Sequence, residues 1–86
     1  MNRAELNIIE LAKDFNGTYQ GGQIAIDNSE MIEKLNGKAV EVKEILGQET
    51  FVFGDGSYIT RNDDVYYTGD DVEDFLFTEM ENSGVL

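Results

Sequence analysis

The sequence contains no cysteine, no histidine and no proline among its 86 residues. Without cysteine or histidine, the chain cannot form disulfides, thiolate zinc sites or imidazole metal sites. It also lacks the commonest general base and the strongest protein nucleophile. The absence of cysteine fits a reducing compartment. Because proline is missing too, turns must depend on the nine glycines and on Asn and Asp.

Long apolar runs are also missing. The longest uninterrupted ones have only three residues, such as Phe51-Val52-Phe53, too short for a signal peptide or a membrane span. We therefore expect no signal peptide and a cytoplasmic location. A chain of 86 residues suffices for one compact domain, which we place at residues 1–86, and leaves no room for a second core.

Basic residues are scarce: the chain has 6 Lys and Arg against 18 Asp and Glu, for a net charge of −12. Residues 62–86 hold eight acidic side chains and no basic one, namely Asp63, Asp64, Asp70, Asp71, Glu73, Asp74, Glu79 and Glu81. We call these eight residues the acidic block. A coat that served solubility alone would intersperse Lys and Arg among them.

The first half of the chain predicts two helices. Asn2 and Glu5 have the spacing of a capping box, and apolar residues then recur at helical intervals, which predicts a helix over residues 3–16 that ends at Gly17. The Gly21-Gly22 pair predicts a tight hairpin or a short extended segment. Residues 27–29 offer caps for a short middle helix that runs to Leu35 and ends at residues 36–37.

The second half predicts a meander followed by a helix. Short strands over residues 38–46, 50–53, 57–61 and 65–67 are separated by Gly, Asn and Asp turns, so the sheet is antiparallel. Asp70 and Glu73 form a second capping box for a last, acidic helix, with a buried stripe of Val72, Phe75, Leu76 and Met80. The predicted fold is α+β, with a three- or four-stranded sheet and the helices packed on one face.

Catalytic, cofactor and metal sites find little support. Ser29, Ser57 and Ser83 occupy helix-end or turn contexts, and no glycine loop continues into the Gly-Lys-Ser/Thr that binds phosphate. The Asp63-Asp64 and Asp70-Asp71 pairs are rich in oxygen but do not follow the ligand order of a calcium loop. We therefore predict a non-enzymatic protein with no cofactor.

The acidic block instead indicates a binding surface. Carboxylates three or four residues apart on a helix lie about 5–6 Å apart, and one nucleic-acid strand carries a phosphate about every 3.4 Å. An ordered row of carboxylates could therefore occupy a groove built for nucleic acid. Tyr66 and Tyr67 are adjacent in a strand and face opposite ways, so one belongs to the core. The other is predicted to lie exposed beside Asp63 and Asp64 as an anchor for a basic partner.

The stretch Phe51-Val52-Phe53-Gly54-Asp55-Gly56-Ser57-Tyr58-Ile59, then Tyr66-Tyr67, then the acidic helix, resembles the small acidic anti-CRISPR proteins of bacteriophages. The resemblance covers about the last forty residues. It implies binding to a Cas protein or surveillance complex, in some members by mimicry of DNA. Other DNA mimics, such as inhibitors of restriction enzymes, work by the same physics.

The leading hypothesis is an inhibitor, monomeric or a small homo-oligomer, that binds a basic nucleic-acid-binding protein through the acidic block, Tyr66 and Tyr67. It would neither bind nucleic acid directly nor contact a membrane. Two alternatives remain open. One is a protein-interaction or accessory module that uses an apolar or tyrosine surface, and the other is a divalent-cation-binding module.

Overall fold

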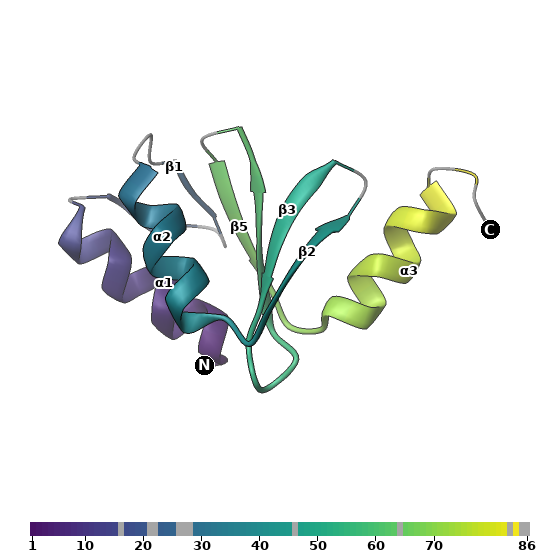
Figure 1. Ribbon diagram of the computed structural model, residues 1–86, viewed down its shortest axis with the longest axis horizontal. Helices are drawn as coiled ribbons and strands as arrows, with labels where there is room; N and C mark the ends of the chain where they lie inside the picture. The colour runs from purple at the N-terminus through teal and green to yellow at the C-terminus, as the bar shows by residue number, and fades with distance from the viewer. Residues whose placement is uncertain are drawn as a thin grey trace.

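The computed structural model describes residues 1–15, 17–20, 23–25, 29–45, 47–63, 65–82 and 84. Within these residues the elements are α1 (Arg3–Asp14), β1 (Gln23–Ala25), α2 (Ser29–Lys38), β2 (Glu41–Ile45), β3 (Gln48–Val52), β4 (Tyr58–Asn62), β5 (Val65–Gly69) and α3 (Val72–Asn82). The α+β class and the antiparallel meander are confirmed (Figure 1). The sheet has five strands rather than three or four.

The additional strand is β1. The sheet order is β1-β5-β4-β3-β2, so β2 to β5 pair with their chain neighbours while β1 joins the outer edge of β5. Gly21 and Gly22 lie outside the described residues. The residues on either side of them, Gln20 and Gln23, exchange backbone hydrogen bonds of 3.0 and 3.2 Å. The sequence predicts a short extended segment here, but its pairing with β5 has no local signal because the partner strand lies more than 40 positions later.

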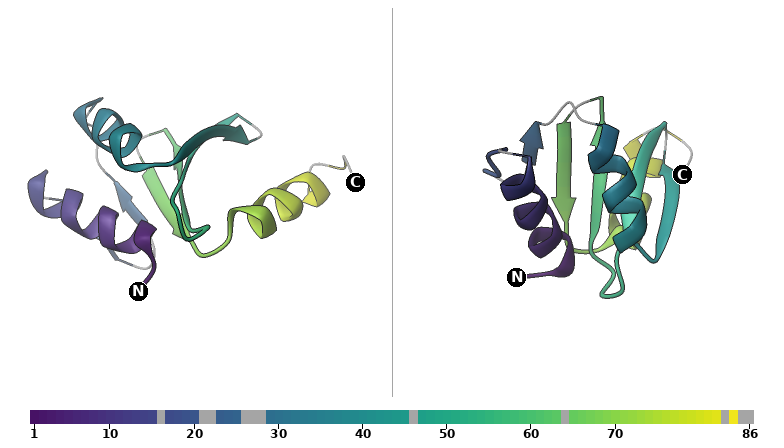
Figure 2. Two further views of the ribbon diagram at one scale, coloured as in Figure 1. Left: turned by 60° about the horizontal axis from the view of Figure 1, so that its bottom comes forward. Right: turned by 60° about the vertical axis from the view of Figure 1, so that its left-hand side comes forward.

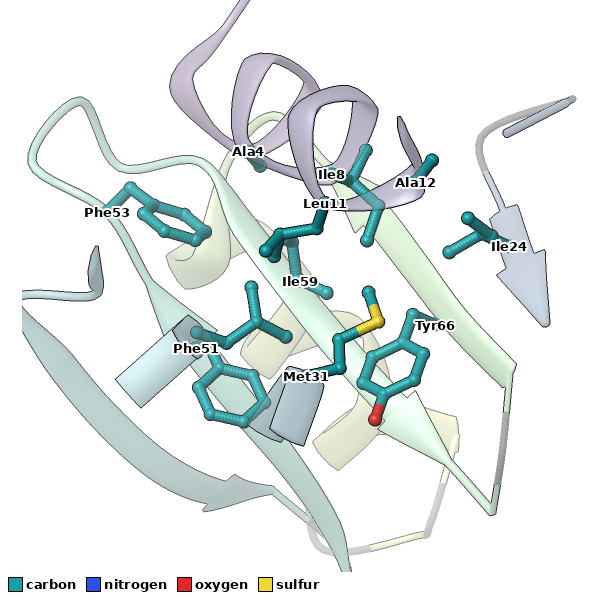
Figure 3. Close-up of a cluster of buried hydrophobic side chains, with 11 residues drawn as sticks. Ala4, Ile8, Leu11, Ala12, Ile24, Met31, Phe51, Phe53, Ile59 and Tyr66 are labelled. Atoms are coloured by element: carbon teal, nitrogen blue, oxygen red, sulfur yellow. The ribbon is translucent and has the colours of Figure 1, made fainter. Parts of the chain in front are cut away.

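The main core lies between the sheet and the helices α1 and α2 (Figures 1 and 3). In register, Phe51 lies opposite Ile59 and Ile24 lies opposite Tyr66, and residues directly opposite in a sheet point to the same face. These side chains meet the apolar stripes of the two helices. The buried cluster consists of Ala4, Ile8, Leu11, Ala12, Ile24, Met31, Leu35, Phe51, Phe53, Ile59 and Tyr66.

The start of α1 matches the local sequence signals, but its end does not. The side chain of Asn2 accepts a hydrogen bond of 2.8 Å from the backbone N–H of Glu5, as a capping residue does. At the other end the C-cap residue is Phe15 rather than the predicted Gly17, although the N–H of Gly17 still donates to the carbonyl of Ala12 at 2.7 Å. The last helical residue is Asp14, two residues before the predicted end.

The middle helix α2 is longer than predicted. It continues through Asn36 and Gly37 to Lys38, and its buried residues Met31 and Leu35 lie one turn apart on the side that faces the core. The predicted caps Asp27 and Asn28 lie outside the described residues.

The last helix, α3, lies on the opposite face of the sheet, which corrects the prediction that the helices share one face (Figures 1 and 2). Val52 follows Phe51 in β3 and therefore points away from the main core. Together with Ile45 and Val72 it forms a second, smaller cluster, against which Phe75 of α3 packs. The strands thus carry apolar side chains on both faces, and each face receives a helix layer.

Candidate acidic interface

The acidic block is divided among three places. Four carboxylates gather where β5 leads into α3, two lie further along α3, and one occupies the turn between β4 and β5 (Figure 1). In that order they are Asp70, Asp71, Glu73 and Asp74; Glu79 and Glu81; and Asp63. Asp64 lies outside the described residues. The idea of one continuous row is therefore corrected, because β5 separates Asp63 from the others by about 17 Å.

Among the described residues, no carboxylate on or before α3 forms an ion pair with a basic side chain. All are exposed except the half-buried Glu79. The described part of the chain forms three side-chain ion pairs, and none involves the acidic block: Lys34–Asp14 at 3.6 Å, Lys38–Glu10 at 3.9 Å and Lys43–Glu41 at 3.7 Å. Arg61 lies across from Glu49 on the face that α1 and α2 cover.

Asp71 caps α3. Its Oδ1 accepts hydrogen bonds from the backbone N–H groups of Glu73 at 3.0 Å and Asp74 at 3.4 Å, which are the first unpaired donors of the helix. The capping role predicted for Asp70 therefore belongs to its neighbour. Because a helix N-terminus carries partial positive charge, the acidic first turn is also favourable for α3 itself.

Asp55 and Ser57, in the turn between β3 and β4, hold the start of α1. The N–H of Arg3 donates to Asp55 Oδ2 at 2.9 Å, and the N–H of Ala4 donates to Ser57 Oγ at 3.0 Å. The Ser57 hydroxyl in turn donates to Asp55 Oδ1. On the neighbouring strand end, Asp70 Oδ1 accepts a 2.6 Å hydrogen bond from the side chain of Asn2.

The same contacts explain the acidity of Asp55. The Ser57 hydroxyl, followed by the N–H of Arg3, lowers the pKa of this carboxyl from 3.8 to about 2, because both donors stabilise its charged form. Asp55 and Asp70 thus have structural partners. The side chains of Glu73, Asp74 and Glu81 form no hydrogen bond or ion pair with other described residues, which leaves them available to a partner.

A shallow depression of about 490 Å³ opens beside the start of α3, between β2 and the β3–β4 turn. Its lining includes one basic residue, Lys43, and five carboxylates: Glu41, Asp55, Asp70, Asp71 and Glu73. Lys43 is paired with Glu41, so the surface around the depression is strongly negative. Asp55 and Glu41 therefore extend the acidic surface beyond the acidic block. They lie near α3 because of the positions of the β3–β4 turn and of β2 in the fold, which local sequence does not reveal.

Tyr58 lies within the field of these carboxylates. Its ring stacks on Phe75 of α3, with 4.7 Å between ring centroids and 16° between ring planes. Burial raises the pKa of the Tyr58 phenol, and the charges of Asp70 and Asp74 raise it further. Tyr58 thus attaches α3 to the sheet, and its raised pKa reflects the negative charge of the nearby carboxylates.

Tyr66 and Tyr67 point to opposite faces, as predicted. Tyr66 is only 1% exposed and belongs to the main core, so its predicted partner contact is excluded by burial in this structure. Tyr67 is 38% exposed and lies across from Gln23 and Thr60. It shares the sheet face of Tyr58 rather than lying beside Asp63, which is four positions earlier beyond the start of β5.

Phe77 is a candidate that the sequence prediction missed. Its side chain is 58% exposed on α3, whereas the predicted stripe residues Val72, Phe75, Leu76 and Met80 are buried or half-buried. The available signal was its spacing, since Phe77 lies one helical turn from both Glu73 and Glu81.

Among the described residues, no group of three or more acidic side chains is arranged to hold a metal ion. No helix in the described ranges is long and apolar enough to cross a bilayer. No protein-family model, no curated protein and no solved structure matches this chain. The geometry of the acidic surface is therefore the feature of the molecule that bears on its function.

Proposed function

We propose that this protein is a non-enzymatic inhibitor that binds a basic surface of a nucleic-acid-binding protein in the cytoplasm and prevents nucleic acid from occupying that surface. A CRISPR–Cas effector is one partner of this chemistry. The observation that carries the proposal is the uncompensated carboxylate surface of α3 and the turn before it. An ordered anionic surface attracts basic grooves and competes for them with phosphates.

The test begins with affinity capture from nuclease-treated cell lysate. A captured nucleic-acid-binding protein is then mixed with fluorescently labelled DNA or RNA, and displacement of the nucleic acid is followed by anisotropy. We expect displacement that weakens steeply between about 50 and 200 mM salt, because binding between opposite charges is screened. Capture of a partner whose nucleic-acid binding is unaffected would contradict the proposal.

Two double variants separate the α3 surface from total charge. Glu73→Gln with Glu81→Gln is expected to weaken displacement by about tenfold, equivalent to about 1.4 kcal/mol. Its matched control, Glu33→Gln with Glu44→Gln, removes the same charge from exposed positions on α2 and β2 and should act within about twofold of the parent protein. If both variants lose the same amount of displacement activity, the effect comes from total charge and not from the α3 surface.

The same experiment tests the alternative of an interaction module with an apolar or tyrosine contact. Under that alternative, binding would persist at high salt and would be lost on Tyr67→Ala, since Tyr67 is the exposed tyrosine of β5. Under the inhibitor proposal, salt dependence dominates and the tyrosine substitution has the smaller effect.

A further inference from the structure

The helix α3 is the least covered helix of the described chain. It is directed away from the sheet (Figures 1 and 2), and of its eleven residues only Val72 is buried. Phe75 and Leu76 are half-buried and pack against the second cluster, formed by Ile45, Val52 and Val72. Most of the outer surface of α3 is therefore available for contacts with another molecule.

The outer surface of α3 carries an aromatic ring between carboxylates. Phe77 is 58% exposed. Glu73 precedes it by one turn and Glu81 follows it by one turn, which places their Cβ atoms about 5–6 Å away on either side. Asp74 lies three residues before Phe77, on the same side of the helix, and is also exposed. A large apolar side chain is therefore framed by negative charge.

A second copy of this chain is a poor occupant for that surface. Every ionisable side chain of α3 is acidic, and its last turn has no basic residue. Two such helices brought together would place like charges in contact, which costs free energy. The complementary surface must be basic and must also tolerate an aromatic ring at its centre.

Arginine satisfies both conditions better than lysine. Its planar guanidinium stacks on an aromatic face while its N–H groups donate to carboxylates in the plane of the stack. Lysine offers a more strongly hydrated point charge with weaker stacking.

We propose that α3 is a recognition helix for an arginine-bearing surface of the partner protein, in which a guanidinium stacks on Phe77 and is hydrogen-bonded by Glu73 or Glu81. The inference rests on the proposed function and names the chemistry of its contact. Phe77 is then the central anchor of the interface, and the surrounding carboxylates set its specificity, as is usual when a few residues carry most of the binding energy.

The test uses labelled nona-arginine and nona-lysine peptides, which carry equal charge, in anisotropy titrations at low salt. We expect the parent protein to prefer the arginine peptide by about fivefold, the size of a modest cation–π contribution. Phe77→Ala should remove this preference and leave the lysine peptide bound within about twofold. Alanine favours the helix more than phenylalanine does, and circular dichroism verifies that the variant remains folded.

Leu6→Ala is the matched control, because Leu6 is 55% exposed on α1 and its loss removes a similar apolar surface elsewhere. It should leave both peptides unaffected. If the parent protein binds both peptides equally, or if Phe77→Ala keeps the arginine preference, the inference is overturned. The inference can be overturned while the inhibitor proposal stands. That is the outcome if Glu73→Gln with Glu81→Gln still weakens the binding of both peptides. If that variant also behaves like Glu33→Gln with Glu44→Gln, both proposals fail.

Discussion

At the scale of single residues, Ser57 and Asp55 connect the β3–β4 turn to the start of α1. Ser57 is fully buried, and its hydroxyl accepts from the N–H of Ala4 while donating to Asp55. The first two N–H groups of α1, which have no partner within the helix, thus find acceptors about 50 positions along the chain. The sequence predicts the Asp-Gly turn. It does not predict that the side chains of this turn accept hydrogen bonds from the first N–H groups of α1, because the two segments meet only in the folded chain.

The lowered pKa of Asp55 predicts a specific loss of stability in acid. Since the pKa falls from 3.8 to about 2 on folding, the charged carboxyl stabilises the folded state above about pH 4. That contribution disappears as the pH falls towards 2. Asp55→Asn should therefore lower the urea midpoint at neutral pH, and the difference from the parent protein should shrink steadily as the pH falls from 4 through 2.

Asp63→Asn is the control for the Asp55 experiment, since Asp63 is exposed in a turn and loses the same charge. Its effect on the urea midpoint should be small and should show no transition between pH 4 and 2. A constant difference between parent and Asp55→Asn across this range would argue against the contacts of Asp55 as the source of its acidity.

At the scale of elements, α3 is attached to the sheet through Tyr58. Gly69 lies opposite Tyr58 in the β4–β5 register, and a Cβ at Gly69 would overlap the Tyr58 ring. The missing side chain thus leaves room for the ring that stacks on Phe75. Glycine in a strand often marks such a close approach of another group.

Gly69→Ala should displace the Tyr58 ring and weaken the packing of α3 against the sheet. We expect it to lower the free energy of unfolding by about 1–3 kcal/mol, the usual cost of forcing an extra carbon into a packed site. Gly54→Ala is the matched control because a Cβ there meets no atom within 4 Å, and its effect should stay within about 0.5 kcal/mol. Equal urea midpoints for the two variants would show that the Tyr58–Gly69 contact contributes little.

The elements themselves were largely predictable, and their arrangement was only partly so. The cap at Asn2 and the apolar spacing of α1 are local signals, and the structure confirms them. The face that α3 occupies depends on Ile45 and Val52, whose strands carry apolar residues on both sides. The capping by Asp71 in place of Asp70 does not follow from periodicity, because it depends on where the chain turns into α3. The exposure of Phe77 does have a signal in its spacing to Glu73 and Glu81.

At the scale of the whole molecule, a net charge of −12 opposes folding. Three ion pairs among the described residues offset little of it, since exposed pairs contribute about 0–1 kcal/mol each. Raising sodium chloride from about 0.01 to 0.5 M shortens the screening length several-fold. We expect the melting temperature to rise by about 4–8 °C, which corresponds to about 1 kcal/mol in a domain of this size.

Calcium chloride at matched ionic strength distinguishes screening from ion binding. Under general screening, calcium and sodium salts stabilise the protein to a similar extent. A much larger rise with calcium would indicate a specific site and favour the divalent-cation alternative. A melting temperature that falls with added sodium chloride would contradict the view that repulsion among carboxylates limits stability.

The position of β1 at the sheet edge has a consequence for how the chain folds. The strands β2 to β5 are joined by short turns and can zip together from local hairpins, whereas Gln23 finds Tyr67 only after 44 intervening steps along the backbone. Closing so large a loop costs chain entropy that early, local contacts do not repay. The three-residue β1 should therefore be the last strand to join the sheet and the first to leave it, briefly baring one side of β5.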